Sequence, residues 1–130
     1  MPAFVVIAWD GTDEGALARR MAARPGHMEA VAPMARDGRL VLGGALLDAP
    51  EGKMVGSVAV VDLPDEAAVR AWIAGDPYGE VWRDVSIHPF RVAPLPYRPL
   101  PGSEAEASAA RPDALPPGVA PAEAGLAALA

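Results

Sequence analysis

The chain has 130 residues and no cysteine, which excludes disulfide bonds and thiolate chemistry, and its two histidines are too few for a structural zinc site. Its net charge of −6 and its scattered arginines argue against a nucleic-acid-binding surface, which needs clustered basic side chains. No apolar run approaches the ~20 residues of a membrane span, and the N-terminus has no basic segment ahead of an apolar one. We therefore expect a cytoplasmic protein that binds no metal, nucleic acid or membrane.

The first quarter of the chain predicts a strand followed by a helix. Residues 3–9 form an apolar, β-branched run closed by a turn signal, which is typical of a central strand. A helix is expected over residues 13–23, with Leu17 and Met21 facing inward. Pro25 is expected to end this helix and open another, because proline lacks an N–H group but fits a first helical turn.

His27 falls in the first turn of this second predicted helix, which should end at Arg36. By helical spacing it shares a face with Val31 and Met34, and that face should point inward. The positive end of the helix dipole disfavours an imidazolium there, so His27 is expected to be neutral and able to accept a proton. The alternative is a core or boundary histidine that is bonded to a carbonyl group.

The remainder of the ordered chain predicts three strands and one helix. The strands are expected over residues 39–42, 56–61 and 85–92, and the helix over 64–75. Gly44, in a glycine pair after the second strand, indicates either a bulge or a close approach of a ligand to the backbone. Asp76 precedes a proline and should leave the helix in an extended conformation. Pro89 confines the last strand to an edge or a bulge.

This order of elements, strand–helices–strand–strand–helix–strand, predicts a ferredoxin-like α+β fold. One four-stranded antiparallel sheet with helices on one face is the most economical packing for it. The other face of the sheet would then be left open. A second copy of the chain is the simplest cover, so we expect a homodimer.

From Pro94 onward the composition changes to proline, alanine, serine and glutamate. Such a segment has too few large apolar side chains to build a core, and it is typical of polyproline II or disordered chain. We therefore expect a folded domain over residues 1–95 and a C-terminal extension over 96–130. An extension that wraps on a partner subunit is the alternative.

Several short motifs, taken in order, resemble the YciI-like (YCII-related) family. They are a histidine in the first helical region, D-G-x-L-V-L-G-G at a strand entry, G-S-V in a strand, D-P-Y after a helix and H-P-F in the last strand. In this chain they correspond to His27 and to residues 37–44, 56–58, 76–78 and 88–90. The resemblance covers about residues 3–93. Pro33 and the C-terminal extension are departures from the family pattern.

The resemblance implies a ferredoxin-like fold of the dimeric α/β-barrel kind, usually as a homodimer. It also implies an active site built around a histidine and an aspartate, which match His27 and Asp76 here. Most members of the family have no assigned reaction. A relative acts as a dehydrochlorinase in chlorinated-aromatic breakdown, and the wider superfamily includes muconolactone isomerases and cofactor-free monooxygenases.

A pairing of His27 with Asp76 also makes chemical sense. A carboxylate on one imidazole nitrogen fixes the tautomer and leaves the other nitrogen free to act as a base. Asp76 follows a helix C-terminus, where the helix dipole destabilises an anion, so a histidine partner would stabilise the carboxylate. The alternative for Asp76 is an Asx-turn residue in front of proline.

Four further residues are candidates for substrate binding. Ser57 is placed to bond a substrate oxygen, Arg24 to meet an anionic group, and Tyr78 to wall a pocket for a planar substrate. Gly44 would let a ligand approach the backbone. Each has a structural alternative: a strand-end serine, a solvated arginine, a core aromatic ring and a bulge, respectively.

Two hypotheses for the function follow. The first is an enzyme without cofactor or metal in which His27, oriented by Asp76, moves a proton on a small cyclic or carboxylated substrate, in an isomerase, lyase or dehydrochlorinase-like reaction. The second is a non-catalytic module for small-molecule binding or dimerisation that uses the same polar pair for recognition. Only the enzyme needs a rate that depends on the protonation of His27.

Overall fold

The computed structural model describes residues 3–98. Its regular structure consists of four strands, two α-helices and one short 3₁₀ helix, which end at residue 90. In chain order these are β1 (Ala3–Asp10), α1 (Ala16–Arg36), β2 (Leu40–Leu47), β3 (Met54–Asp62), α2 (Glu66–Gly75), η1 (Pro77–Glu80) and β4 (Trp82–Phe90).

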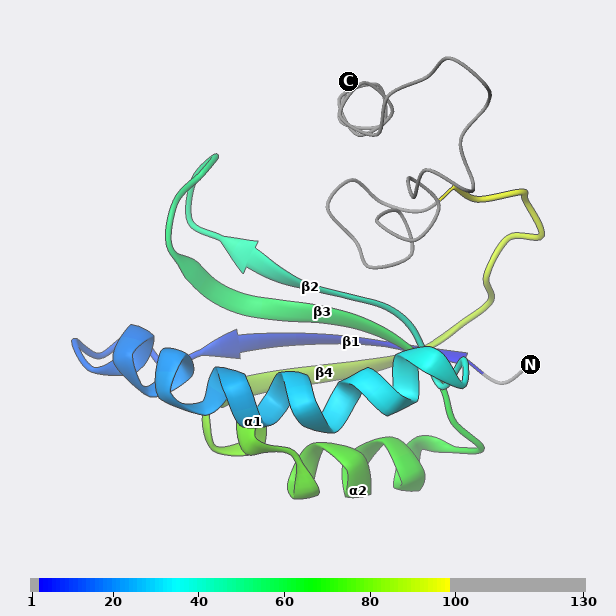
Figure 1. Ribbon diagram of the computed structural model, residues 1–130, viewed down its shortest axis with the longest axis horizontal. Helices are drawn as coiled ribbons and strands as arrows, with labels where there is room; N and C mark the ends of the chain where they lie inside the picture. Colours follow the sequence, from blue (N-terminus) through cyan, green and yellow to red (C-terminus); the bar gives the residue numbers. More distant parts are fainter. Residues whose placement is uncertain (1–2, 99–130) are drawn as a thin grey trace, which may run out of the picture. The chain divides into compact units, whose positions relative to one another are not determined.

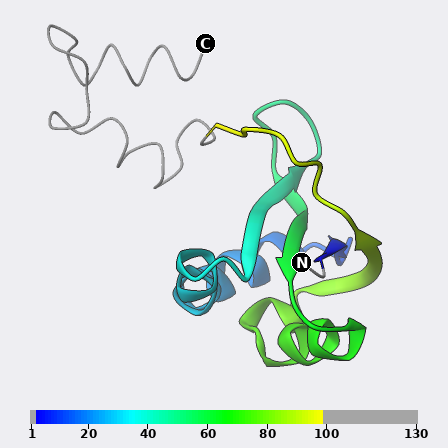
Figure 2. The ribbon, with the colours of Figure 1, turned by 90° about the vertical axis from the view of Figure 1, so that its right-hand side faces the viewer.

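The four strands form one sheet in the order β2-β3-β1-β4, and every neighbouring pair is antiparallel (Figure 1). Val6 in β1 is opposite Ala59 in β3 and Ile87 in β4, which fixes the register of the three strands. Both helices lie on the same face of the sheet (Figure 2). The predicted ferredoxin-like α+β fold is confirmed. Pro89 lies in an edge strand, where it costs no ladder hydrogen bond on the free side.

The core lies between this face and the helices because the strands alternate. Val6, Ala59 and Val61 point toward the helices and are buried, and Val69 of α2 packs against them. Asp65 caps α2, since its side chain accepts a hydrogen bond from the N–H of Ala68 at 2.8 Å. The predicted start of this helix is therefore confirmed to within a residue or two.

The prediction that Pro25 separates two helices is wrong: α1 is one continuous helix that contains both Pro25 and Pro33. Both prolines lie on the exposed side, where water can hydrate the carbonyl groups that lose a helical partner. Gly26 packs so closely against Pro77 that a Cβ atom would lie 3.3 Å from that ring. The Pro-Gly pair thus serves helix packing here, and it does not mark a turn.

The sheet has its irregularities beside the glycine pair. The register of β2 against β3 shifts between Leu40 and Leu42, at Val41, and again between Leu46 and Leu47. A bulge at Gly44 is one of the two interpretations of this glycine. Gly44 pairs regularly with Val58, so the register shifts lie at other positions of β2. Gly38, in contrast, has a φ of +86° at the end of α1, a conformation that favours glycine after a helix.

The face of the sheet that the helices leave open is apolar. Leu42 pairs with Val60, and Val58 pairs with Ile7, so side chains of β2, β3 and β1 share this face. Leu42 is 43% exposed, and Trp9, two residues beyond Ile7, is 45% exposed. Such a face is typical of a surface that is buried against another chain.

Residues 93–98 follow β4 as exposed chain without regular structure. The predicted extension over residues 96–130 lies outside the described residues from residue 99 onward. Within residues 3–98, neither helix is both long enough and apolar enough to cross a membrane.

Candidate active site

Asp76 is fixed at the junction of α2 and η1. Its backbone is extended, with φ −89° and ψ 143°, because Pro77 disfavours the helical region for the residue before it. The carboxylate caps η1: Oδ1 accepts a hydrogen bond from the N–H of Tyr78 at 2.8 Å. The side chain is only 1% exposed, and Oδ2 has no hydrogen-bond partner among the described residues.

His27 reaches this carboxylate from α1. Its Nδ1 lies 2.7 Å from Asp76 Oδ1, as the sequence predicts for the pair. With Asp76 ionised, Nδ1–H donates and the neutral ring keeps Nε2 free as an acceptor. The helix-dipole argument for His27 is wrong, however, because the residue lies in the interior of α1 and not at a helix N-terminus. The carboxylate orients the imidazole, and the helix end has no part in it.

Tyr78 contacts both members of this pair. Its ring stacks on the imidazole of His27 with the centroids 3.7 Å apart and the planes 10° from parallel. The rings of Trp82 and Tyr78 pack in a T-shaped arrangement, with their centroids 5.6 Å apart. Burial of Tyr78 raises the pKa of its phenol, and the positive charges of Arg20 and Arg24 oppose this rise. The Tyr78 phenol is therefore neutral at neutral pH.

A buried polar network, which we call the Arg20 network, adjoins the Tyr78 ring. Arg20 Nη1 donates to both carboxylate oxygens of Asp10, at 3.0 and 3.1 Å, and Nη2 donates to Ser57 Oγ at 2.8 Å. Trp82 Nε1 donates to the same hydroxyl at 3.1 Å. The side chains of Arg20 and Asp10 are each 3% exposed. The guanidinium carbon lies 4.7 Å from the centroid of the Tyr78 ring.

Two residues of this network, Asp10 and Arg20, are not among the site residues predicted from the sequence. Asp10 is interpreted as a turn residue, and Met21 is expected inside, whereas Met21 is 47% exposed and Arg20 takes the inner position. A signal for Arg20 is present in the chain. The inward-facing side chains of α1 repeat at helical spacing on both sides of Pro25, and they are Ala16, Arg20, Ala23, His27, Val31 and Met34. Arg20 and His27 are the polar members of this stripe.

The remaining candidates for substrate binding fall in different places. Ser57 is buried in the Arg20 network, where its oxygen already accepts two hydrogen bonds. Arg24 is exposed on α1 and is not joined to the site by any hydrogen bond among the described residues. Gly44 pairs with Val58 on the open face, so the sheet separates it from His27 and Asp76. Of the four, Tyr78 contacts the pair directly, and Ser57 belongs to the adjoining Arg20 network.

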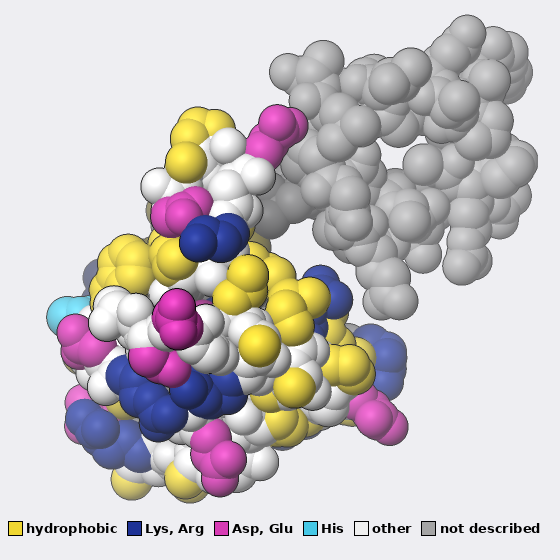
Figure 3. All heavy atoms as spheres, turned by 90° about the vertical axis from the view of Figure 1, so that its left-hand side faces the viewer, with side chains coloured by type: hydrophobic (Ala, Val, Ile, Leu, Met, Phe, Trp, Pro, Cys, Tyr) yellow, Lys and Arg dark blue, Asp and Glu magenta, His cyan; other side chains and the backbone are white. Residues whose placement is uncertain are grey.

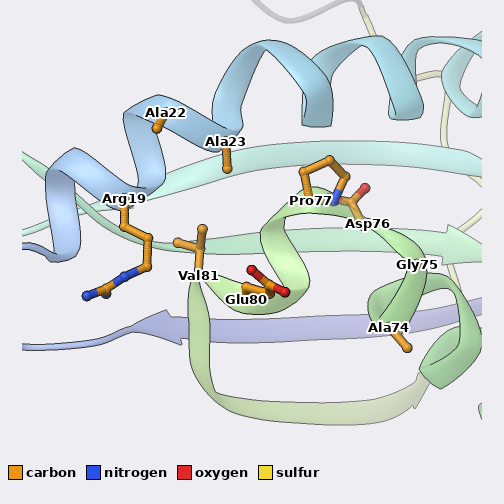
Figure 4. Close-up of a pocket in the computed structure, with 9 residues that line it drawn as sticks. All are labelled: Arg19, Ala22, Ala23, Ala74, Gly75, Asp76, Pro77, Glu80 and Val81. Carbon is orange, nitrogen blue, oxygen red and sulfur yellow. The ribbon is translucent and has the colours of Figure 1, made fainter.

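An open groove of about 580 Å³ lies between α1 and the end of α2 (Figure 4). Its lining is mostly small and apolar and comprises Arg19, Ala22, Ala23, Ala74, Gly75, Asp76, Pro77, Glu80 and Val81. Asp76 thus lines the groove, whereas His27, which is 15% exposed, does not. Of the two members of the pair, Asp76 alone lies in the lining of this groove.

Charged side chains of both signs gather at the end of the molecule where α1 begins (Figure 3). There Arg19 donates to Asp13 at 2.8 Å on the surface, and this hydrogen bond lowers the pKa of the Asp13 carboxyl. Within residues 3–98, histidine, aspartate and glutamate side chains form no cluster of three that could hold a metal ion.

Comparison with known proteins places the chain in a family. The sequence model of the YCII-related domain matches residues 4–91, which is more than half of the chain. The chain belongs to the YCII-related family. Protein YciI of Escherichia coli O6:H1 and protein YciI of Shigella flexneri are each 28% identical to it over 95 residues, 68% of this chain and 95% of theirs.

Two solved structures are similar to the chain. The chain is similar to 5-chloro-2-hydroxyhydroquinone dehydrochlorinase from Burkholderia phenoliruptrix AC1100, in complex with 2,5-dihydroxybenzoquinone, with a TM-score of 0.62 and 18% identity over 70% of this chain and 95% of that one. A dimeric ferredoxin-like protein of unknown function from Jannaschia sp. CCS1 is similar with a TM-score of 0.41 and 18% identity, over 71% of this chain and 100% of that one.

Proposed function

We propose that this protein is a cofactor-independent enzyme in which His27, oriented by Asp76, is the general base for a small cyclic or carboxylated substrate. The observation that carries the proposal is the hydrogen bond of 2.7 Å between His27 Nδ1 and a carboxylate that is 1% exposed. It fixes the ring and leaves Nε2 free. The buried carboxylate also caps η1, so the free Nε2 is the feature that supports a base beyond this structural role.

The proton transfer follows from this arrangement. Nε2 takes a proton from the substrate, and the ring becomes an imidazolium. Asp76 then faces a positive charge across the existing hydrogen bond, so the carboxylate stabilises the charged form without moving. General-base catalysis of this kind contributes typically ~10²–10⁴-fold to the rate.

Two outcomes for the substrate are compatible with one base. In an elimination, the electron pair of the broken C–H bond forms a double bond while a halide leaves with its own pair, which is a dehydrochlorinase-like lyase step. In an isomerisation, the imidazolium returns the proton to another carbon of the same substrate. The fold shared with a dehydrochlorinase supports the first of these as the reaction to test first.

The apolar open face of the sheet supports a second part of the proposal, that the protein is a homodimer through this face. Leu42 and Trp9 are both more than two-fifths exposed there. A second copy would remove these side chains from water, which stabilises the assembly by about 25 cal/mol for each Å² of apolar surface buried.

The test is a substrate panel assayed with the full-length protein. It contains 5-chloro-2-hydroxyhydroquinone, with chloride release as the readout, and a muconolactone, with ultraviolet absorbance as the readout. The wild type is compared with His27→Ala and with His88→Ala, which removes the other histidine of the chain. Because His88 pairs with Val5 on the open face, the oligomeric state of this control is measured as well.

The proposal expects turnover by the wild type and by His88→Ala, and none by His27→Ala. Equal turnover by His27→Ala would contradict it. Calorimetric binding of a panel member without turnover by the wild type would favour the alternative, a non-catalytic small-molecule-binding module.

A further inference from the structure

Tyr78 touches both members of the dyad. Its N–H donates to Asp76 Oδ1 at 2.8 Å, and its ring stacks on His27 at 3.7 Å. The placement of this ring therefore decides which way the imidazole plane faces. A shift of the ring would move His27 and loosen the cap on η1 at the same time.

Arg20 holds the same ring. Arg20 and His27 are seven residues apart on α1, a rise of about 10.5 Å along the helix axis, and the Tyr78 ring contacts both of their side chains. Arg20 is itself fixed, because Asp10 and Ser57 engage both of its Nη atoms. The guanidinium over an aromatic face also makes a favourable cation–π contact.

We propose that Arg20 is a positioning residue for the dyad: its buried ion pair with Asp10 fixes the guanidinium against Tyr78, and Tyr78 in turn orients His27 and Asp76. The order of contact is Asp10, Arg20, Tyr78, His27. Among the described residues Arg20 has no hydrogen bond to either dyad member, and the ring that it contacts directly is that of Tyr78.

Stability alone does not explain a buried ion pair at this place. The cost of removing two charges from water commonly cancels their attraction, and apolar residues of similar volume stabilise a fold as well or better. A rigid guanidinium with fixed partners, in contrast, holds a neighbouring ring more firmly than a flexible aliphatic side chain does. The position of the pair, directly against the Tyr78 ring, is where such rigidity affects the dyad.

The first experiment observes His27 directly and needs no substrate. In ¹⁵N-labelled full-length protein, the Nδ1–H proton of His27 should give a downfield resonance that exchanges slowly with water, since it is bonded to a buried carboxylate. The chain has two histidines, so its persistence in His88→Gln identifies it as that of His27. Absence of the resonance in the wild type would contradict the dyad itself and, with it, the proposed function.

The variants then test the chain of contacts. Tyr78→Phe keeps the ring and should keep the resonance. Tyr78→Leu and Arg20→Lys should lose it to rapid exchange with water, although the backbone amide spectrum still shows a folded protein. If Arg20→Lys does not fold, Asp10→Asn removes the charge that anchors the guanidinium, leaves Ser57 and Trp82 paired, and should broaden the resonance. An unchanged resonance in Tyr78→Leu, or in the folded variant of Arg20 or Asp10, overturns the proposal.

The second experiment rests on the proposed function and is kinetic. On a substrate that the wild type turns over, Arg20→Lys should lower kcat about 10- to 100-fold and leave KM within a few-fold, as for other residues that orient a reactive group. A fall in activity through a higher KM alone would mean that Arg20 serves binding. An inactive wild type would contradict the proposed function but leave the spectroscopic result on positioning intact.

Discussion

Replacement of Arg20 by methionine should destabilise the fold far more than the same replacement of its neighbour Arg19. Each arginine is paired with an aspartate on the chain segment before α1. Arg20 and Asp10 are both 3% exposed, whereas Arg19 and Asp13 are 34% and 54% exposed. Arg20→Met leaves the Asp10 carboxylate buried and without a partner, which costs about 3–5 kcal/mol. A surface pair contributes little, so Arg19→Met should leave the stability nearly unchanged.

Urea unfolding followed by tryptophan fluorescence measures this difference, and thermal melting checks it. A loss of roughly 3 kcal/mol lowers the melting temperature by about 12 °C or more in a domain of this size, at roughly 4–8 °C for each kcal/mol. The double variant Asp10→Asn/Arg20→Met should recover much of the loss, because it leaves no charge buried alone. A cost of Arg20→Met no greater than that of Arg19→Met would refute the reasoning.

Three further predictions concern pH, assembly and the extension. The variant Tyr97→Phe leaves Tyr78 as the only tyrosine, and its tyrosinate absorbance should rise at a higher pH than that of a free phenol. Because folding raises the pKa of Tyr78, the stability that this residue contributes is complete below about pH 10. It is lost as the pH rises through the pKa of the folded state. By light scattering the protein should be a dimer, and Leu42→Asp should make it a monomer. A protein that ends at Gly102 should melt at nearly the same temperature as the full chain, because the segment beyond it has few large apolar side chains.

Each of these has a clear opposite result. An ordinary titration in the Tyr97→Phe protein would mean that Tyr78 is solvated. Met21→Asp, a change of an equally exposed apolar residue on α1, is the control for the dimer; a wild-type monomer, or a dimer that survives Leu42→Asp, would remove the open face as the interface. A fall of many degrees on truncation at Gly102 would indicate that the extension packs on a folded domain.

The fold could be predicted from the sequence because strand periodicity, turn chemistry and helix ends point to the same topology. The apolar, β-branched runs of β1 and β3 and the capped start of α2 each carry a local signal. Pro25 is misleading, because local propensity treats it as the end of a helix. The fold keeps the helix instead, since Gly26 beside it allows the close contact with Pro77.

The site is predictable only in part. Asp76 is signalled by the proline that follows it, and His27 by the family motif and by the apolar face that it shares. Arg19 and Arg20 cannot be told apart by residue type, and only the continuous stripe on α1 shows that Arg20 points inward. The partnership of Arg20 with Asp10 and Ser57 depends on the sheet bringing distant strands together, which no local pattern in the chain reports.

The most direct test of the central claim is the turnover of Asp76→Asn. The asparagine oxygen can still accept from the N–H of Tyr78 and keep the cap on η1, but the charge that stabilises the imidazolium is lost. We expect kcat to fall about 10²–10⁴-fold, with calorimetric affinity for the substrate largely intact. Turnover of Asp76→Asn at close to the wild-type rate would contradict the account, because His27 would then need no carboxylate to act as a base.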